Sequence, residues 1–364
     1  MSNGFRWESA DPGKQGIDEV RLCALQRDIA SRGGTKALLI ARNDRIVCEW
    51  YASDSGPAKR QGTASLAKAL VGGTSLLLAL NDGLMQVDDP ACKYLPRWRE
   101  HPEKSKITIR HLATHTSGIE DAEIAGRSHE TLDGWKGDFW AGRGKGKPNS
   151  ISIALEVAPI LFPPGTKYAY SNPGMGALSC AITASLRGTP HEDIYSLLKA
   201  RVFDPIGVPE EEWSIGYDCP YLVDGLRVFA NWGGGEFTAR ATASIGRLML
   251  RRGDWEGRRL IASSWVDRAL TDAGMPRPAG GLPDGTQYES GLCWWVNGDG
   301  SWSQAPRDAF VGAGAGDQVL LVVPSLNLIV VRYGDDDLDD WQESGWWSPI
   351  VKHLFNPVME AICG

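Results

Sequence analysis

The chain has 364 residues, 42% of them hydrophobic and 23% charged, and a formal net charge of −7. This length can bury a sizeable core and allows two domains, whereas the negative charge and the scattered Lys and Arg argue against a nucleic-acid-binding protein. The N-terminal residues lack an apolar signal core and no run approaches the ~20 apolar residues of a membrane span, so we expect a cytoplasmic protein with no membrane partner. The seven scattered cysteines predict reduced thiols.

The first elements predicted along the chain are a β-hairpin and a helix. Residues 36–41 and 45–51 are apolar, β-rich runs on either side of Arg42-Asn43-Asp44, which is a turn signal. The apolar run 66–80 predicts a helix that follows a small, polar stretch. Ser65 stands at the start of this helix, where free N–H groups and the positive end of the helix dipole surround it.

Ser65 and Lys68 form a Ser-x-x-Lys pair at this helix start. Positions i and i+3 share a helix face, so the lysine amine lies one turn from the serine hydroxyl. A serine hydroxyl is a weak nucleophile at neutral pH, and a desolvated lysine whose pKa falls to roughly 7–8 can remove its proton. The pair therefore predicts a nucleophile and its base. The alternative is an N-cap serine beside a solvated lysine.

The chain holds a second Ser-x-x-Lys pair, Ser196 and Lys199, in a different setting. This pair lies inside the amphipathic run 194–203, where both residues are predicted to face solvent. We therefore expect chemistry at Ser65 and not at Ser196.

A candidate metal motif lies in the segment 81–226, which predicts helices separated by long connections rich in Pro and Gly. His111 and His115 are four residues apart, a spacing that can place two metal ligands on one helix face. No acidic residue completes a His-Glu-x-x-His pattern, so we expect structural histidines and no metal site.

Two further motifs lie downstream. Tyr170-Ser171-Asn172 is the only Tyr-x-Asn in the chain; the alternatives are a core tyrosine and a turn asparagine. The glycine-rich stretch 312–318 leads into an apolar run, and such a strand entry lets backbone approach a ligand closely and leaves N–H groups free. Strands are predicted at 292–297, 308–311, 318–323 and 328–333, and a last helix at about 347–362.

An ordered set of three motifs resembles the serine β-lactamase and penicillin-binding protein superfamily, particularly its class C and family VIII carboxylesterase branch. The motifs are Ser-x-x-Lys, Tyr-x-Asn and the glycine-containing strand, and the similar flanking segments are 83–90, 94–96, 108–119, 203–208, 231–239 and 323–325. The resemblance implies an α+β fold: an antiparallel β-sheet flanked by helices, formed by residues 1–80 and 227–364, with an inserted, mainly helical domain at 81–226. The active site is expected between these domains.

The resemblance also implies a role for each site residue. Ser65 attacks a carbonyl and forms an acyl-enzyme, while Lys68 and Tyr170 form the proton-transfer pair, and either is a candidate for the base in the free enzyme. We expect both pKa values to be tuned toward neutrality. Asn172 is expected to hydrogen-bond Lys68 and the acyl-side amide of a substrate. The backbone N–H groups of Ser65 and Ala315 are expected to hold the oxyanion, with no cofactor.

The third motif departs from the family pattern. Where many relatives carry Lys-Thr-Gly, or His in the first position, this chain has Gly312-Ala313-Gly314. The cation that would hold a substrate carboxylate is missing, and Arg307 and Arg332 are the nearest ones in sequence. We therefore expect Gly314 and Ala315 to belong to a substrate and oxyanion site that favours uncharged acyl groups.

The fifteen tryptophans suggest an aromatic pocket. Most large aromatic residues pack in cores. In the family that this chain resembles, however, loops at the positions of several of these tryptophans form the sides of the active-site groove. We expect a pocket built from Trp135, Trp140, Trp232 and Trp347.

These observations predict a serine hydrolase that acts on small, uncharged esters as a carboxylesterase. One alternative is an amide hydrolase of the same family, such as a β-lactamase, a D-aminopeptidase or an enzyme that cleaves short ω-amino-acid amides. Another is a catalytically silent binding protein on the same fold, which the intact Ser65, Lys68 and Tyr170 argue against. The expected partner is a small-molecule ester or amide; the sequence leaves the oligomeric state open.

Overall fold

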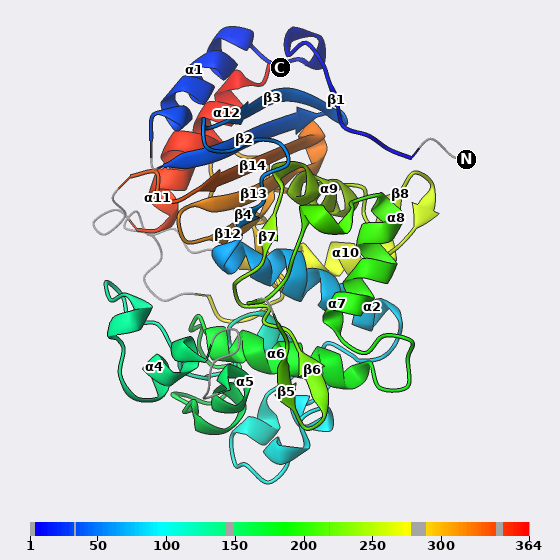
Figure 1. Cartoon of the computed structure of the whole chain (residues 1–364), viewed down its shortest axis with the longest axis vertical. Helices are drawn as coiled ribbons and strands as arrows, with labels where there is room; N and C mark the ends of the chain where they lie inside the picture. Colours follow the sequence, from blue (N-terminus) through cyan, green and yellow to red (C-terminus); the bar gives the residue numbers. More distant parts are fainter. Residues whose placement is uncertain are drawn as a thin grey trace.

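The computed structural model describes residues 4–32, 34–142, 149–217, 219–277, 289–339 and 345–363. Its centre is an eight-stranded sheet with the strand order β1-β3-β2-β14-β13-β12-β11-β10. All neighbouring strands are antiparallel except β1 and β3. The predicted α+β class is confirmed (Figure 1). The strands are β1 (Glu8–Ser9), β2 (Thr35–Arg42), β3 (Arg45–Tyr51), β10 (Glu289–Ser290), β11 (Trp295–Val296), β12 (Phe310–Gly314), β13 (Gln318–Val323) and β14 (Leu328–Gly334).

The predicted hairpin and the last two predicted strands are confirmed as β2 with β3, β13 and β14. Asn43 and Asp44 join β2 to β3 with φ angles of 53° and 61°, a region that Asn and Asp enter more readily than other non-glycine residues. The strand predicted at 292–297 is present only as β11, which covers Trp295–Val296. The Leu292 N–H donates to Ala269 O and the Cys293 N–H to Ala113 O, so these residues leave the ladder and tie it to the helices.

Helices cover both faces of the sheet (Figure 1). Alternate strand residues point to opposite faces, so Leu39 and Leu320 enter the core shared with α9, whereas Leu38 and Leu321 enter the core shared with α1 and the C-terminal helices. The predicted last helix is confirmed and includes a π-helical stretch at Val351–Phe355. The helices are α1 (Glu19–Ala30), α9 (Ala239–Leu250), α10 (Ser263–Ala269), α11 (Trp347–Ile350) and α12 (Asn356–Ala361).

The middle of the chain is mainly helical. Its α-helices are α3 (Ile109–Ala113), α4 (Gly134–Ala141), α5 (Ser150–Ser152), α6 (Asn172–Ser185), α7 (Ile194–Leu198) and α8 (Asp204–Ile206). The small two-stranded sheets are β4 (Gln61–Gly62) with β7 (Glu236–Phe237), β5 (Tyr221–Val223) with β6 (Leu226–Val228), and β8 (Asp254–Trp255) with β9 (Arg258–Arg259). The domain boundaries at 80 and 226 stay predictions.

The helix of the Ser-x-x-Lys pair runs from Ala64 to Asn81. It begins as a 3₁₀ turn, continues as a π-helical segment at Lys68–Gly73 and ends as α2 (Thr74–Asn81). Among the described residues, this is the one helix long and apolar enough to cross a membrane, and 83% of it is buried inside the molecule. Its apolar character therefore matches its place in the core, where its first turns contact β12.

Candidate active site

Ser65 sits on a strained turn at the start of this helix. The preceding residue, Ala64, has a φ of 44°, a left-handed conformation that alanine rarely adopts and that recurs at functional sites. Thr63 anchors the turn, because its hydroxyl donates to Gly234 O at 2.6 Å and its N–H donates to Gly235 O at 3.1 Å. The surrounding loop therefore holds the nucleophile candidate in place.

The structure brings Ser65, Lys68, Tyr170 and Asn172 together. Lys68 Nζ lies 3.0 Å from Ser65 Oγ, and the Tyr170 hydroxyl lies 2.8 Å from the same oxygen. Lys68 Nζ also donates to Asn172 Oδ1 at 2.7 Å, across a sequence separation of 104 residues. Two proton carriers therefore flank one serine hydroxyl, which is the geometry of an activated nucleophile.

Lys68 is almost fully buried and makes a third hydrogen bond, to the main-chain carbonyl of Trp232 at 2.6 Å. Burial disfavours the charged ammonium and lowers the pKa of Lys68 to about 8, although Glu123 and Asp121 nearby act in the opposite direction. A substantial neutral fraction near pH 8 makes Lys68 able to act as a base.

Tyr170 behaves differently from the expectation. Burial, followed by the charge of Glu123, raises the pKa of Tyr170 well above its usual value. The His115 ring stacks on it with centroids 4.4 Å apart, and burial together with Lys68 lowers the pKa of His115 to about 3. The prediction of pKa values tuned toward neutrality therefore fits Lys68 and is wrong for Tyr170, which is a neutral phenol in the free protein.

Two acidic residues next to the Lys68 network were missed by the sequence analysis. Asp121 Oδ1 accepts the N–H of Asn172 at 2.8 Å and its Nδ2 at 3.0 Å, so it fixes the amide whose oxygen faces Lys68. Glu123 lines the cavity. Their only sequence signal was their place directly after the family-like segment that ends at Ile119.

Asn172 makes one of its two predicted contacts within the protein itself. Its Oδ1 contacts Lys68 as predicted. Its Nδ2, however, is bound to Asp121, and Asn172 is 1% exposed and does not line the described cavity. Asp121 therefore holds one of the two Nδ2 hydrogens, and the expected contact of Asn172 with a substrate amide stays a prediction.

Gly314 and Ala315 lie beside Ser65. A Cβ on Gly314 would sit 2.7 Å from the backbone nitrogens of Ser65 and Leu66, so only glycine permits this approach of β12. Ala315 lines the same cavity as Ser65. Neither the Ser65 N–H nor the Ala315 N–H has a backbone partner within the described parts of the chain, as an oxyanion site requires.

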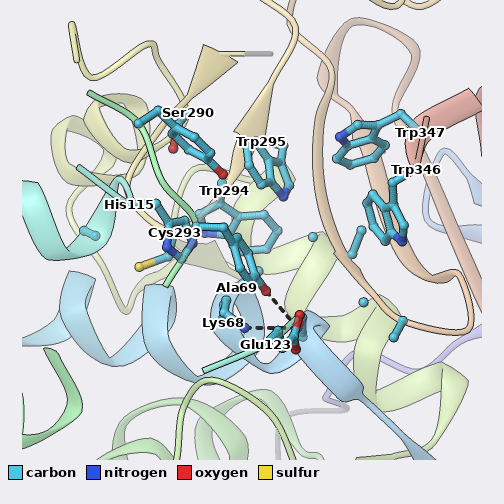
Figure 2. Close-up of a pocket in the computed structure, with 18 of the residues that line it drawn as sticks. Lys68, Ala69, His115, Glu123, Ser290, Cys293, Trp294, Trp295, Trp346 and Trp347 are labelled. Carbon is cyan, nitrogen blue, oxygen red and sulfur yellow. Dashed lines mark hydrogen bonds between the residues drawn. The ribbon is translucent and has the colours of Figure 1, made fainter. Parts of the chain in front are cut away.

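A cavity of about 410 Å³ opens above this network (Figure 2). One wall is a continuous aromatic row: Tyr168 lies 6.1 Å from Trp295, Trp295 lies 5.9 Å from Trp347, and Trp347 lies 4.8 Å from Trp346, measured between ring centroids. Trp294 and the chain from Gly312 to Ala315 also line it. The cavity therefore suits an apolar or aromatic group next to the Ser65 hydroxyl.

Of the four predicted pocket tryptophans, only Trp347 lines this cavity. Trp140 stacks on His129 at 3.6 Å and donates to Ala122 O, and Trp135 packs beside Lys136. Trp232 is 1% exposed and reaches the site through its main-chain carbonyl alone. The pocket prediction is corrected accordingly, because these three indoles fill the helical core or its surface.

The remaining sequence candidates lie elsewhere. Ser196 and Asp193 form a helix-capping box, and Lys199 pairs with Asp204 on the surface. His111 caps α3 by accepting the Thr108 N–H, whereas His115 accepts the Ser171 N–H, so the two rings serve different contacts. The described residues contain no group of three or more His, Cys, Asp or Glu able to hold a metal.

The fold and this geometry are those of a serine hydrolase. A sequence profile described as Beta-lactamase matches residues 26–341, and the chain belongs to this family. It is 23% identical over 360 residues to the 6-aminohexanoate-dimer hydrolase of Paenarthrobacter ureafaciens, a match that covers 94% of this chain and 82% of that protein.

Solved structures of the same fold have several activities. One is a family VIII carboxylesterase, with a TM-score of 0.66 and 14% identity over 94% of this chain and 99% of that one. Another is a penicillin-binding protein from Bacillus halodurans, with a TM-score of 0.62 and 18% identity over 86% of this chain and 96% of that one. The similar proteins thus include an amide hydrolase and a carboxylesterase.

Proposed function

We propose that the protein is a carboxylesterase that acts on small esters with uncharged acyl groups. The observation that carries this proposal is the charge of the cavity. Among its described lining residues, Lys68 is the one lysine or arginine, and its hydrogens are committed to Ser65, Asn172 and Trp232. Among these described residues, no cation is left to bind a substrate carboxylate.

Packing explains why the third motif lacks its cation. A Cβ on Gly312 would sit 2.7 Å from Ala69 Cβ and from Leu66 Cδ1, so this strand position has no room for a side chain. The two arginines nearest in sequence point elsewhere: Arg307 donates to Gly298 O, and Arg332 is fully buried beneath the β12–β13 turn.

The proposed reaction uses the residues already described. Neutral Lys68 accepts the Ser65 proton while Ser65 Oγ attacks the ester carbonyl, and the N–H groups of Ser65 and Ala315 hold the oxyanion. The C–O bond then breaks, and the alcohol leaves with a proton from Lys68 or Tyr170. Water deprotonated by the same pair hydrolyses the acyl-enzyme. An ester suits this site because its alkoxide needs less protonation than an amine leaving group.

A direct comparison of two chromogenic substrates tests the proposal. We expect kcat/KM on a short-chain p-nitrophenyl ester to exceed that on a chromogenic cephalosporin by at least about a hundredfold, since the described residues of the cavity offer no free cation to the cephalosporin carboxylate. Both assays use one preparation, with Ser65→Ala protein as the blank. A higher kcat/KM on the cephalosporin would overturn the esterase assignment.

A second candidate is hydrolysis of amides or esters of ω-amino acids. Glu123 favours it: its side chain is 45% exposed and lies 3.7 Å from His129. Although burial opposes ionisation, His129 and Lys68 outweigh burial and lower the pKa of Glu123. A carboxylate in a cavity that indole rings also line can bind an ammonium group. The matched relative from Paenarthrobacter ureafaciens is a 6-aminohexanoate-dimer hydrolase.

A further inference from the structure

The turn that carries Ala315 has a left-handed backbone at two successive residues. It connects β12 to β13, whose ends pair at Gly314 and Gln318. Gly316 and Asp317 both have left-handed φ angles, 74° and 48°. Such a turn has alternative arrangements in which a peptide group rotates and presents a carbonyl oxygen where an N–H stood. An oxyanion donor on it therefore needs external support.

A buried arginine lies directly behind this turn. Arg332, on β14, is fully buried, and its Nη1 donates to Gly316 O and, at 3.0 Å, to Asp317 O. Its Nη2 donates to Thr35 Oγ1 at 3.0 Å and to Asp336 O at 3.1 Å. One guanidinium thus joins two carbonyls of the turn to the start of β2.

Gln318 holds the same turn from its C-terminal end. Its Nε2 donates to Ala315 O at 3.2 Å and to Gly334 O at 2.5 Å, and its Oε1 accepts the Gly334 N–H at 3.1 Å. The Gly316 N–H donates to Asp337 Oδ1 at 2.9 Å. Side chains therefore bind both polar groups of the Ala315–Gly316 peptide, the peptide that follows the Ala315 N–H.

We propose that Arg332 and Gln318 are positioning residues that hold the Ala315–Asp317 turn so that the Ala315 N–H stays available as an oxyanion donor. This inference rests on the proposed acyl transfer at Ser65. The carbonyl oxygens of Ala315, Gly316 and Asp317 accept hydrogen bonds from Arg332 or Gln318, so the three peptide groups that follow the Ala315 N–H are held in one orientation. Burial strengthens these charge-assisted bonds relative to bonds in water.

The test compares Arg332→Lys and Gln318→Met with Thr35→Val. Lysine keeps the charge but loses the planar fork, and methionine keeps the volume of Gln318 but loses its bonds. Thr35→Val removes the hydrogen bond between Arg332 Nη2 and the Thr35 hydroxyl on β2, and it leaves the bonds from Arg332 to the turn intact. The melting temperature of this variant therefore reports the loss of stability without a change at the turn. Gln318→Met provides the answer if Arg332→Lys protein fails to fold.

Three quantities are measured: kcat and KM on a p-nitrophenyl ester, the rate of Ser65 labelling by a fluorophosphonate, and the melting temperature. We expect kcat and the labelling rate to fall by about tenfold or more in both turn variants, because one oxyanion donor typically contributes 10²–10³ in rate, with KM changed by less than about threefold. Thr35→Val is expected to lower the melting temperature with kcat unchanged.

Wild-type kcat and labelling rates in both turn variants, with lowered melting temperatures, would overturn the inference and leave Arg332 and Gln318 with a structural role alone. The labelling assay separates this failure from failure of the esterase proposal. A fluorophosphonate reports attack by Ser65 whatever the preferred leaving group, whereas the esterase proposal fails on the comparison of ester with cephalosporin.

Discussion

The side-chain nitrogen of Lys68 lies 2.6 Å from the main-chain carbonyl oxygen of Trp232. An ammonium has three N–H donors, and this carbonyl, Asn172 Oδ1 and Ser65 Oγ accept one each. When Lys68 loses a proton, its two remaining hydrogens stay bonded to the Trp232 carbonyl and to Asn172 Oδ1. The lone pair of the Lys68 nitrogen then faces Ser65 Oγ. Trp232 thus orients the base through its backbone.

Removal of each serine hydroxyl should show which of the two Ser-x-x-Lys pairs is catalytic. We expect Ser65→Ala to lower kcat by about four orders of magnitude or more and to abolish fluorophosphonate labelling, with little change in melting temperature. Ser196→Ala, which alters a helix cap on the surface, is the matched control and should hydrolyse esters at close to the wild-type rate. Retained turnover in Ser65→Ala protein would refute the nucleophile assignment.

Lys68 and Tyr170 should act as one unit. Lys68→Ala and Tyr170→Phe are each expected to lower kcat by about a hundredfold or more, since each removes a proton carrier in contact with Ser65 Oγ. The double variant should lose little more than the worse single variant. Steady-state kinetics on one ester gives all four rates, and simple additivity of the two losses would contradict a coupled pair.

The pH dependence should report the lysine. Lys68 must be neutral to accept the Ser65 proton, and burial lowers its pKa to about 8. Below that pH the ammonium predominates, so kcat/KM should rise with pH, with a midpoint near pH 8, and level off above it. The measurement is kcat/KM on a p-nitrophenyl ester between about pH 6 and pH 9.5, corrected for spontaneous hydrolysis. A rise with a midpoint far from pH 8 would assign the base to another group, and a fall through pH 8 would show that the protonated lysine is the active form.

Glu123 should distinguish charged from neutral acyl groups. If its carboxylate binds an ammonium, Glu123→Gln lowers kcat/KM on the p-nitrophenyl ester of 6-aminohexanoate by about tenfold, because hydrogen bonds to charged groups contribute about 1.5–3 kcal/mol. The hexanoate ester is the matched neutral substrate. The ratio of the two kcat/KM values cancels any effect of Glu123 on Lys68. An unchanged ratio would rule out ammonium recognition by this residue.

Gly314 should be intolerant of any side chain. In Gly314→Ala protein the new Cβ would meet backbone atoms of Thr63, Ser65 and Leu66 at 2.7 Å, and backbone atoms move only at a cost. We expect a destabilisation of about 1–3 kcal/mol, measured by urea unfolding, and a kcat lowered by about tenfold or more. Gly62→Ala is the control, since a Cβ there meets nothing within 4 Å. Equal kcat values in the two variants would argue against close packing of β12 on the nucleophile turn.

The sequence patterns were enough to predict the local geometry. The i, i+3 spacing places Lys68 beside Ser65 on one helix face, and the apolar, β-rich runs on either side of Arg42-Asn43-Asp44 predict a hairpin whatever lies beyond it. The ordered motifs also indicated that Tyr170 and Asn172 belong with this pair, as the structure shows.

Properties of the site that depend on contacts between residues far apart in sequence came only from the tertiary structure. Burial beside Glu123 sets the direction of the Tyr170 pKa, and the path of the chain makes the Trp232 carbonyl, and not its indole, a part of the site. Contact with Leu66 and Ala69 leaves no space for a cation at Gly312. Packing and desolvation arise from neighbours far apart in sequence, so a pattern in one stretch of chain cannot specify them.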